Sequence, residues 1–127
     1  MIAYVSRTGN IKDIVGRLDK SIPTMELTSS SVVNEPYYLF TYTDRLGEAP
    51  EVVRQFLSSH EDNRKNLRGV IASGNTNFGK QNFCGSATEI SQSLNVPIIR
   101  MIDLRGNQDD IAEISSSYIK TIAGEHV

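Results

Sequence analysis

The hydrophobic positions of this chain alternate between two spacings along its length. Short apolar runs without polar alternation are typical of strands that are covered on both faces of a sheet. Such runs predict five strands, which cover Ile2–Val5, Pro23–Leu27, Pro36–Thr43, Gly69–Ser73 and Pro97–Ile102. The second run is weak and begins with a proline. Because proline cannot donate to a central hydrogen-bond ladder, we expect that strand at an edge of the sheet.

Apolar residues with helical spacing follow most of the predicted strands. Residues that recur at i, i+3, i+4 and i+7 form one buried helical face. The sequence predicts four such helices: after Asn10 (Ile11, Ile14, Val15, Leu18), after Pro50 (Val53, Phe56, Leu57), after Gly85 (Ala87, Ile90, Leu94) and after Asn107 (Ile111, Ile114, Tyr118, Ile122). Pro50 suits the first position of its helix. Asn107 and Asp110 resemble an N-cap with an acidic N3 residue.

This alternation of apolar strands and amphipathic helices predicts one α/β domain over residues 1–127, with a doubly wound parallel sheet and helices on both faces. Five strands in a chain of this length favour the order 2-1-3-4-5. The connection from the second strand to the third, Thr28–Glu35, has eight residues. Parallel crossovers usually need roughly a dozen or more residues, so we expect this crossover to lack a full helix.

The predicted strand order reverses between the first and third strands. In open α/β sheets, ligands bind at the carboxyl ends of the strands that flank such a reversal. The loops at this edge are Ser6–Asn10 and Thr43–Ala49, with Gly74–Gly85 beside them, and they are the loops richest in Gly, Thr, Asn and Ser. The sequence therefore predicts a binding site at this edge.

The first of these loops has the composition of a phosphate cradle. It opens a helix, whose unpaired amino-terminal N–H groups favour anions, and Gly9 lets backbone approach closely. Ser6, Thr8 and Asn10 add side-chain donors. The loop lacks the Lys-Ser/Thr ending of a P-loop and the G-x-G-x-x-G pattern of dinucleotide sites, so a phosphate monoester fits better. A plain helix cap by Ser6 or Thr8 is equally compatible with the loop taken alone.

Composition and charge exclude several classes of function. The chain is 39% hydrophobic and 22% charged, and its net charge of -2 gives no strong field for nucleic acid. We interpret its one basic run, Arg64, Lys65 and Arg68, as a solvated loop. No apolar run approaches the ~20 residues that span a bilayer, so we expect no membrane association and a cytoplasmic location.

The chain is poor in residues that bind metals or act as nucleophiles. Its two histidines and one cysteine form no recognisable zinc site, catalytic triad or disulfide framework. His60 lies in a polar helix end, where a basic residue complements the helix dipole. Cys84 begins a helix, where a thiolate is favoured. We favour a packed small residue beside a cofactor instead, because no second cysteine could resolve a disulfide.

Two longer stretches carry a family resemblance. A strand followed by "SRTGN" resembles the flavodoxins, which bind flavin mononucleotide (FMN) by its phosphate in this loop. The stretches "TYTDRLGEAPEVVRQFL" and "GVIASGNTNFGKQNFCGSA" resemble the flavodoxin-like activators of class Ib ribonucleotide reductase, the NrdI type, and the resemblance covers essentially the whole chain. One departure is "RMIDLRGNQDD", where the family more often has a Phe-Glu-Leu-x-Gly-Thr run. We expect this segment to lie away from the flavin loops.

The resemblance implies which residues bind the flavin. Ser6, Arg7, Thr8, Gly9 and Asn10 would hold the phosphate, and the ring would lie among Thr41, Tyr42, Thr43, Asp44, Leu46, Gly47, Gly74, Asn75, Asn77, Phe78, Gly79 and Cys84. Tyr42 and Phe78 are the aromatic candidates for ring contact, although Tyr42 is alternatively a core residue of its strand. Gly47 and Gly79 could supply the backbone freedom for a peptide that turns over when the flavin is reduced.

The resemblance also implies a function. Reduced FMN would react with O₂ to give superoxide or a related oxidant, which helps assemble the radical in the small subunit of class Ib ribonucleotide reductase. An unidentified electron donor would reduce the flavin, and the protein would be an accessory flavoprotein with no catalytic side chain or bound metal. One alternative is a small flavodoxin that carries single electrons, although typical flavodoxins are more acidic than this chain. Another is a non-redox module that binds a different phosphate ligand.

Overall fold

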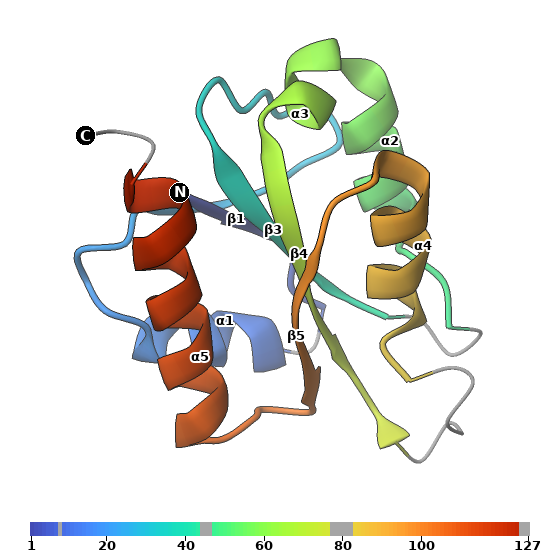
Figure 1. The fold of residues 1–127 in the computed structure, drawn as a ribbon. Helices are drawn as coiled ribbons and strands as arrows, with labels where there is room; N and C mark the ends of the chain where they lie inside the picture. The colour runs from blue at the N-terminus through green and yellow to red at the C-terminus, as the bar shows by residue number, and fades with distance from the viewer. Residues whose placement is uncertain (8, 44–46, 77–82, 125–127) are drawn as a thin grey trace.

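The computed structural model describes residues 1–7, 9–43, 47–76 and 83–124 (Figure 1). The elements in chain order are β1 (Ile2–Tyr4), α1 (Asn10–Arg17), β2 (Thr24–Glu26), β3 (Tyr37–Tyr42), α2 (Glu51–Ser59), α3 (Glu61–Lys65), β4 (Leu67–Gly74), α4 (Gly85–Leu94), β5 (Ile98–Asp103), α5 (Gln108–Tyr118) and the π-helical turn η2 (Ile119–Ala123). The strands form one parallel sheet in the order β2-β1-β3-β4-β5, which confirms the predicted order and the edge position of β2.

The sheet lies between two helical layers, with α1 and α5 on one face and α2 and α4 on the other (Figure 1). The central strand β3 shows why both faces are apolar. Tyr37 and Leu39 point into the cluster under α2 and α4, whereas Tyr38 and Phe40 point into the cluster under α1 and α5. All four side chains are buried, because successive residues of a strand face opposite sides of the sheet.

The crossover from β2 to β3 contains no helix: residues 27–36 are all described, and none is helical. A buried asparagine from α3 holds this segment instead. The Asn63 side-chain amide donates to the carbonyls of Ser31 at 3.0 Å and Phe56 at 2.9 Å, and its oxygen accepts from the Val33 N–H at 2.8 Å. The Tyr37 hydroxyl donates to the Asn63 carbonyl. Side-chain hydrogen bonds thus fix the crossover that the sequence predicts to be poor in helix.

The structure corrects two sequence predictions in this region, the loop assigned to the basic run and the start of the fourth strand. The basic run is not a loop, because Arg64 and Lys65 belong to α3 and Arg68 belongs to β4. Parallel pairing of Tyr37 with Leu67 extends β4 two residues before the predicted start, and the Asn63 contacts hold α3 against the crossover. Basic residues can therefore belong to a helix or a strand, and the polarity of this run did not show that it was a loop.

The helix termini agree more closely with the sequence. The Asp110 N–H donates to the Asn107 side chain at 3.0 Å, and the Asp110 carboxylate accepts from the Asn107 N–H at 2.9 Å. This capping box confirms the predicted start of α5. Pro50 is the N-cap of α2 rather than its first residue, because its backbone is extended. Among the described residues, no helix is long and apolar enough to cross a bilayer.

Candidate functional site

The carboxyl ends of β1, β3 and β4 lie side by side at one edge of the sheet. The Val5 N–H donates to the Phe40 carbonyl at 3.1 Å, and the Thr43 N–H donates to the Ser73 carbonyl at 3.0 Å. These bonds continue the parallel ladders past the ends of the strands. They bring the loops after β1, β3 and β4 together, as the predicted strand order requires.

The loop after β1 ends at a glycine that starts α1. Gly9 is the N-cap with φ of 90°, in the left-handed region, and its carbonyl accepts from the Asp13 N–H at 2.9 Å. A Cβ atom added to Gly9 would meet no atom within 4 Å, so there is room beside the Gly9 backbone on that side. The Lys12 N–H donates to the Ser6 hydroxyl at 3.4 Å. That distance is long for an N–H···O bond, so Ser6 caps the helix weakly.

The loop after β3 packs against the start of α4. The Thr43 and Ser86 hydroxyls are 2.6 Å apart, and Gly47 has φ of 78°. A Cβ atom added to Gly85 would lie 2.1 Å from the Gly47 carbonyl oxygen, so only glycine fits at the first position of α4. Sequence reasoning missed Gly85 and Ser86, because their role depends on a contact with a loop that lies about forty residues earlier in the chain.

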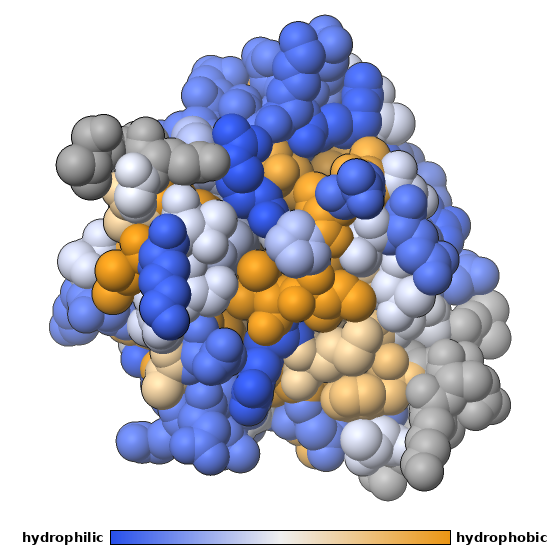
Figure 2. All heavy atoms as spheres, viewed as in Figure 1, coloured by the Kyte–Doolittle hydropathy of each residue, from blue (hydrophilic) through white to orange (hydrophobic). Residues whose placement is uncertain are grey.

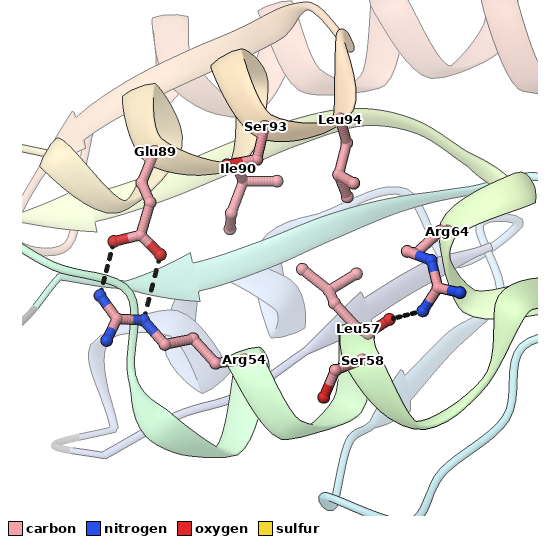
Figure 3. A pocket seen from close by; sticks show the side chains of 8 residues that line it. All are labelled: Arg54, Leu57, Ser58, Arg64, Glu89, Ile90, Ser93 and Leu94. Atoms are coloured by element: carbon pink, nitrogen blue, oxygen red, sulfur yellow. Dashed lines mark hydrogen bonds and ion pairs between the residues drawn. The ribbon is translucent and has the colours of Figure 1, made fainter.

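An ion pair holds the far end of the same loop. Glu89 of α4 accepts from Arg54 of α2 through both carboxylate oxygens, at 2.8 and 3.1 Å, and from the Ala49 N–H at 3.3 Å (Figure 3). The groove beside this pair has a volume of about 310 Å³ and lies between α2 and α4. Its lining residues are Arg54, Leu57, Ser58, Arg64, Glu89, Ile90, Ser93 and Leu94. None is a predicted site residue, so this groove is separate from the predicted site.

The two ends of the loop after β4 meet at Gly74 and Cys84. A Cβ atom on Gly74 would lie 3.0 Å from the Cys84 nitrogen and 3.2 Å from its sulfur. The Cys84 thiol is fully buried and donates to the Ala72 carbonyl at 3.4 Å. Burial raises the pKa of this thiol to about 12, so it stays protonated at neutral pH although it lies at the N-cap of α4. The geometry supports the packed residue over the thiolate.

This chain is similar to known proteins over most of its length. The family model described as "NrdI Flavodoxin like" matches residues 2–116. The chain belongs to this family. Protein NrdI of Macrococcus caseolyticus (strain JCSC5402) is 39% identical over 115 residues, which are 91% of this chain and 85% of that protein. This finding confirms the resemblance that the sequence motifs indicated.

Solved flavodoxins share the fold of this NrdI family member. A short-chain flavodoxin associated with a non-canonical PDU bacterial microcompartment matches 99% of this chain and 97% of its own, with a TM-score of 0.67 and 16% identity. The Streptococcus pneumonia TIGR4 flavodoxin matches 98% and 97% of the two chains, with a TM-score of 0.67 and 22% identity. The Fusobacterium nucleatum flavodoxin bound to flavin mononucleotide matches 98% and 96%, with a TM-score of 0.55 and 20% identity. These similarities establish a flavodoxin-like fold.

At the carboxyl end of β3, this NrdI family member buries two of the predicted ring residues to different degrees. Thr41 is fully buried, and its hydroxyl donates to the Tyr42 carbonyl at 2.9 Å. Tyr42 is half-buried and packs against both core clusters. The core alternative for Tyr42 therefore accounts for part of its surface, and the rest is exposed at the carboxyl end of β3.

The segment after β5 contradicts one expectation. Asp103 and Leu104 lie in "RMIDLRGNQDD", which we expected away from the flavin loops, yet both contact the loop after β4. The Thr76 N–H and hydroxyl donate to the two Asp103 carboxylate oxygens at 3.2 and 3.3 Å, and the Leu104 N–H donates to the Gly74 carbonyl at 2.8 Å. The expectation was wrong because β5 lies beside β4, so their carboxyl ends are neighbours. Asp103 and Leu104 follow from the predicted strand order, because ligands bind at the carboxyl ends of neighbouring strands and these two residues lie at the carboxyl end of β5.

Several predicted site residues lie outside the described part of the chain. These are Thr8, Asp44, Leu46, Asn77, Phe78 and Gly79. Of the others, Arg7 is exposed, Asn10 begins α1, and Asn75 directly follows β4. Within the described ranges, no group of three His, Cys, Asp or Glu side chains is placed to hold a metal ion.

Proposed function

We propose that this chain binds FMN at the carboxyl edge of its sheet. The phosphate would lie at the amino end of α1, where N–H groups of the first turn and the helix dipole favour a dianion. The room beside the Gly9 backbone supports this placement, and the weak Ser6–Lys12 bond is easily exchanged for bonds to phosphate oxygens. The exposed Arg7 supplies a cation beside the same turn.

The flavin ring would lie between the loops that follow β3 and β4. Gly47 is in a left-handed conformation and is backed by the start of α4, so its peptide is a candidate for hydrogen bonds to the polar edge of the ring. Tyr42 offers partly exposed aromatic surface nearby. The predicted ring residues Asn75, Asn77, Phe78 and Gly79 belong to the loop whose two ends meet at Gly74 and Cys84.

We further propose that the protein supplies an oxidant for radical assembly in the small subunit of class Ib ribonucleotide reductase. Membership of the NrdI flavodoxin-like family over residues 2–116 is the observation that carries this proposal. Bound FMN, once reduced by a separate electron donor, would supply the one-electron chemistry that converts O₂ to superoxide or a related oxidant. The protein's own residues bind and orient the cofactor and leave its edge open to O₂ and the partner. We place this activity in the cytoplasm.

The test mixes reduced, FMN-loaded protein with O₂ and the metal-loaded small subunit, followed by electron paramagnetic resonance. The expected result is a protein radical that is absent with flavin-free protein. A signal no larger than in that control would contradict the proposal. The flavodoxin-like fold also supports a second candidate, a one-electron carrier. A carrier would reduce an added acceptor protein but generate no radical in the subunit.

A further inference from the structure

The carboxyl end of β5 holds both ends of the loop that follows β4. At the start of the loop, the Leu104 N–H donates to the Gly74 carbonyl at 2.8 Å, and the Ser73 hydroxyl donates to the Leu104 carbonyl at 2.9 Å. At its far end, the Cys84 thiol lies 3.7 Å from the Ile102 carbonyl oxygen. The end of β5 thus contacts the chain at both ends of this loop.

The backbone of Leu104 is held in an unfavourable conformation at this end of β5. Its φ is 54°, in the left-handed region, and its side chain is 44% exposed. A leucine in this region is strained, and such strain persists where surrounding contacts over-determine the backbone. The bonds to Ser73 and Gly74 are contacts of this kind. They fix the position of the adjacent Asp103.

Asp103 uses this fixed position to bind Thr76. One carboxylate oxygen accepts from the Thr76 N–H at 3.2 Å, and the other accepts from its hydroxyl at 3.3 Å. The side chains of both residues are exposed, so the contact adds little to core packing. Its effect is local: it fixes the backbone at Thr76, directly before the predicted ring residues Asn77, Phe78 and Gly79.

We propose that Asp103 is a positioning residue for the flavin-ring loop, an inference that rests on the proposed FMN site. Its two acceptor oxygens orient the Thr76 peptide, which lies two residues after β4, at the edge of the sheet where the proposed function places the flavin ring. Figure 2 shows an apolar patch on the surface along β5, between α4 and α5. Asp103 is a charged residue at the carboxyl end of that strand.

The test compares three variants of the full chain. Asp103→Asn keeps the size of the side chain but removes one acceptor and the charge, and Asp103→Glu keeps both acceptors. Asp109→Asn, at an exposed position in the first turn of α5, is the control with the same change in net charge. FMN affinity is measured by flavin fluorescence, ring environment by visible circular dichroism of bound FMN, and the Thr76 amide exchange rate by nuclear magnetic resonance in flavin-free protein.

We expect Asp103→Asn to weaken FMN binding and speed Thr76 exchange about fivefold, which corresponds to ~1 kcal/mol. The circular dichroism of FMN bound to Asp103→Asn should differ from that of wild type. Asp103→Glu should keep most of the wild-type affinity, exchange rate and spectrum, and Asp109→Asn should match wild type in all three. Equal affinity and exchange in Asp103→Asn and Asp109→Asn would overturn the positioning role. If wild type binds no FMN, the proposed function fails. Faster Thr76 exchange in Asp103→Asn would then still show the anchor, while the assignment to a flavin loop would be withdrawn.

Discussion

Side-chain hydrogen bonds hold two segments of this protein, the β2–β3 crossover and the start of the loop after β4. The crossover is held by Asn63, which is 0% exposed and bonded at its amide, its side-chain oxygen and its backbone carbonyl. The site loop is held by Asp103 and Thr76, which are both exposed. Burial makes the first network a stabilising feature, because its groups cannot exchange to water. The groups of the second can exchange with water because they are exposed, so we expect it to contribute less to stability and to act locally on the Thr76 backbone.

The largest expected effect comes from breaking the buried network. Asn63→Ala leaves the Val33 N–H and the Ser31 and Phe56 carbonyls without their side-chain partner, so we expect unfolding free energy to fall by about 3 kcal/mol. Urea denaturation measures this change. Asn34→Ala, at an exposed position of the same crossover, should lower the unfolding free energy by less than about 0.5 kcal/mol. Similar losses in both variants would show that the buried amide does not hold the crossover.

A substitution at the boundary between framework and site should affect both stability and binding. Gly85→Ala places a Cβ atom against the Gly47 carbonyl, so the loop after β3 must move. We expect a loss of about 2 kcal/mol in unfolding free energy, together with weaker FMN binding. The matched control is Gly16→Ala in α1, where an added Cβ meets nothing within 4 Å. It should gain about 0.5–1 kcal/mol and leave FMN affinity unchanged. A stable, FMN-binding Gly85→Ala protein would contradict the close contact.

The smallest expected effect at neutral pH concerns the buried thiol, because this effect appears only in alkaline solution. Folding raises the pKa of Cys84 from 9.0 to about 12, so the folded state favours the protonated thiol. Its contribution to stability is therefore fully present below pH 9 and is lost as pH rises from 9 towards 12. Urea unfolding of wild type and Cys84→Ser across this range isolates the effect, because serine does not titrate there. Wild type should lose more stability than the variant, and parallel curves would refute the shifted pKa.

Periodicity was sufficient for the framework of the fold. The apolar runs predicted all five strands and their order, and the helical stripes predicted α1, α2, α4 and α5. Helix α3 was missed because its residues are mostly charged, with no apolar stripe, and its one buried side chain is the polar Asn63. The pattern of hydrophobic residues cannot reveal an element that is held by a buried amide.

The candidate site was predictable in location but not in its supports. Polar, glycine-rich loops after β1, β3 and β4 indicated the edge of the sheet, and the motifs in them indicated the family that the comparison confirmed. The sequence did not reveal that Gly85 accommodates Gly47 or that Asp103 binds Thr76. Each contact joins residues more than twenty positions apart, whose meeting depends on sheet order and register together.

The sequence by itself determined the layered architecture, the edge that carries the site and the family, because these follow from local periodicity and from motifs within single loops. The tertiary structure alone decided how those loops are held and the state of Cys84. Burial outweighs the helix amino terminus there and keeps the thiol protonated. Long-range contacts and desolvation depend on what surrounds a residue in space, and neither is encoded in its immediate neighbours along the chain.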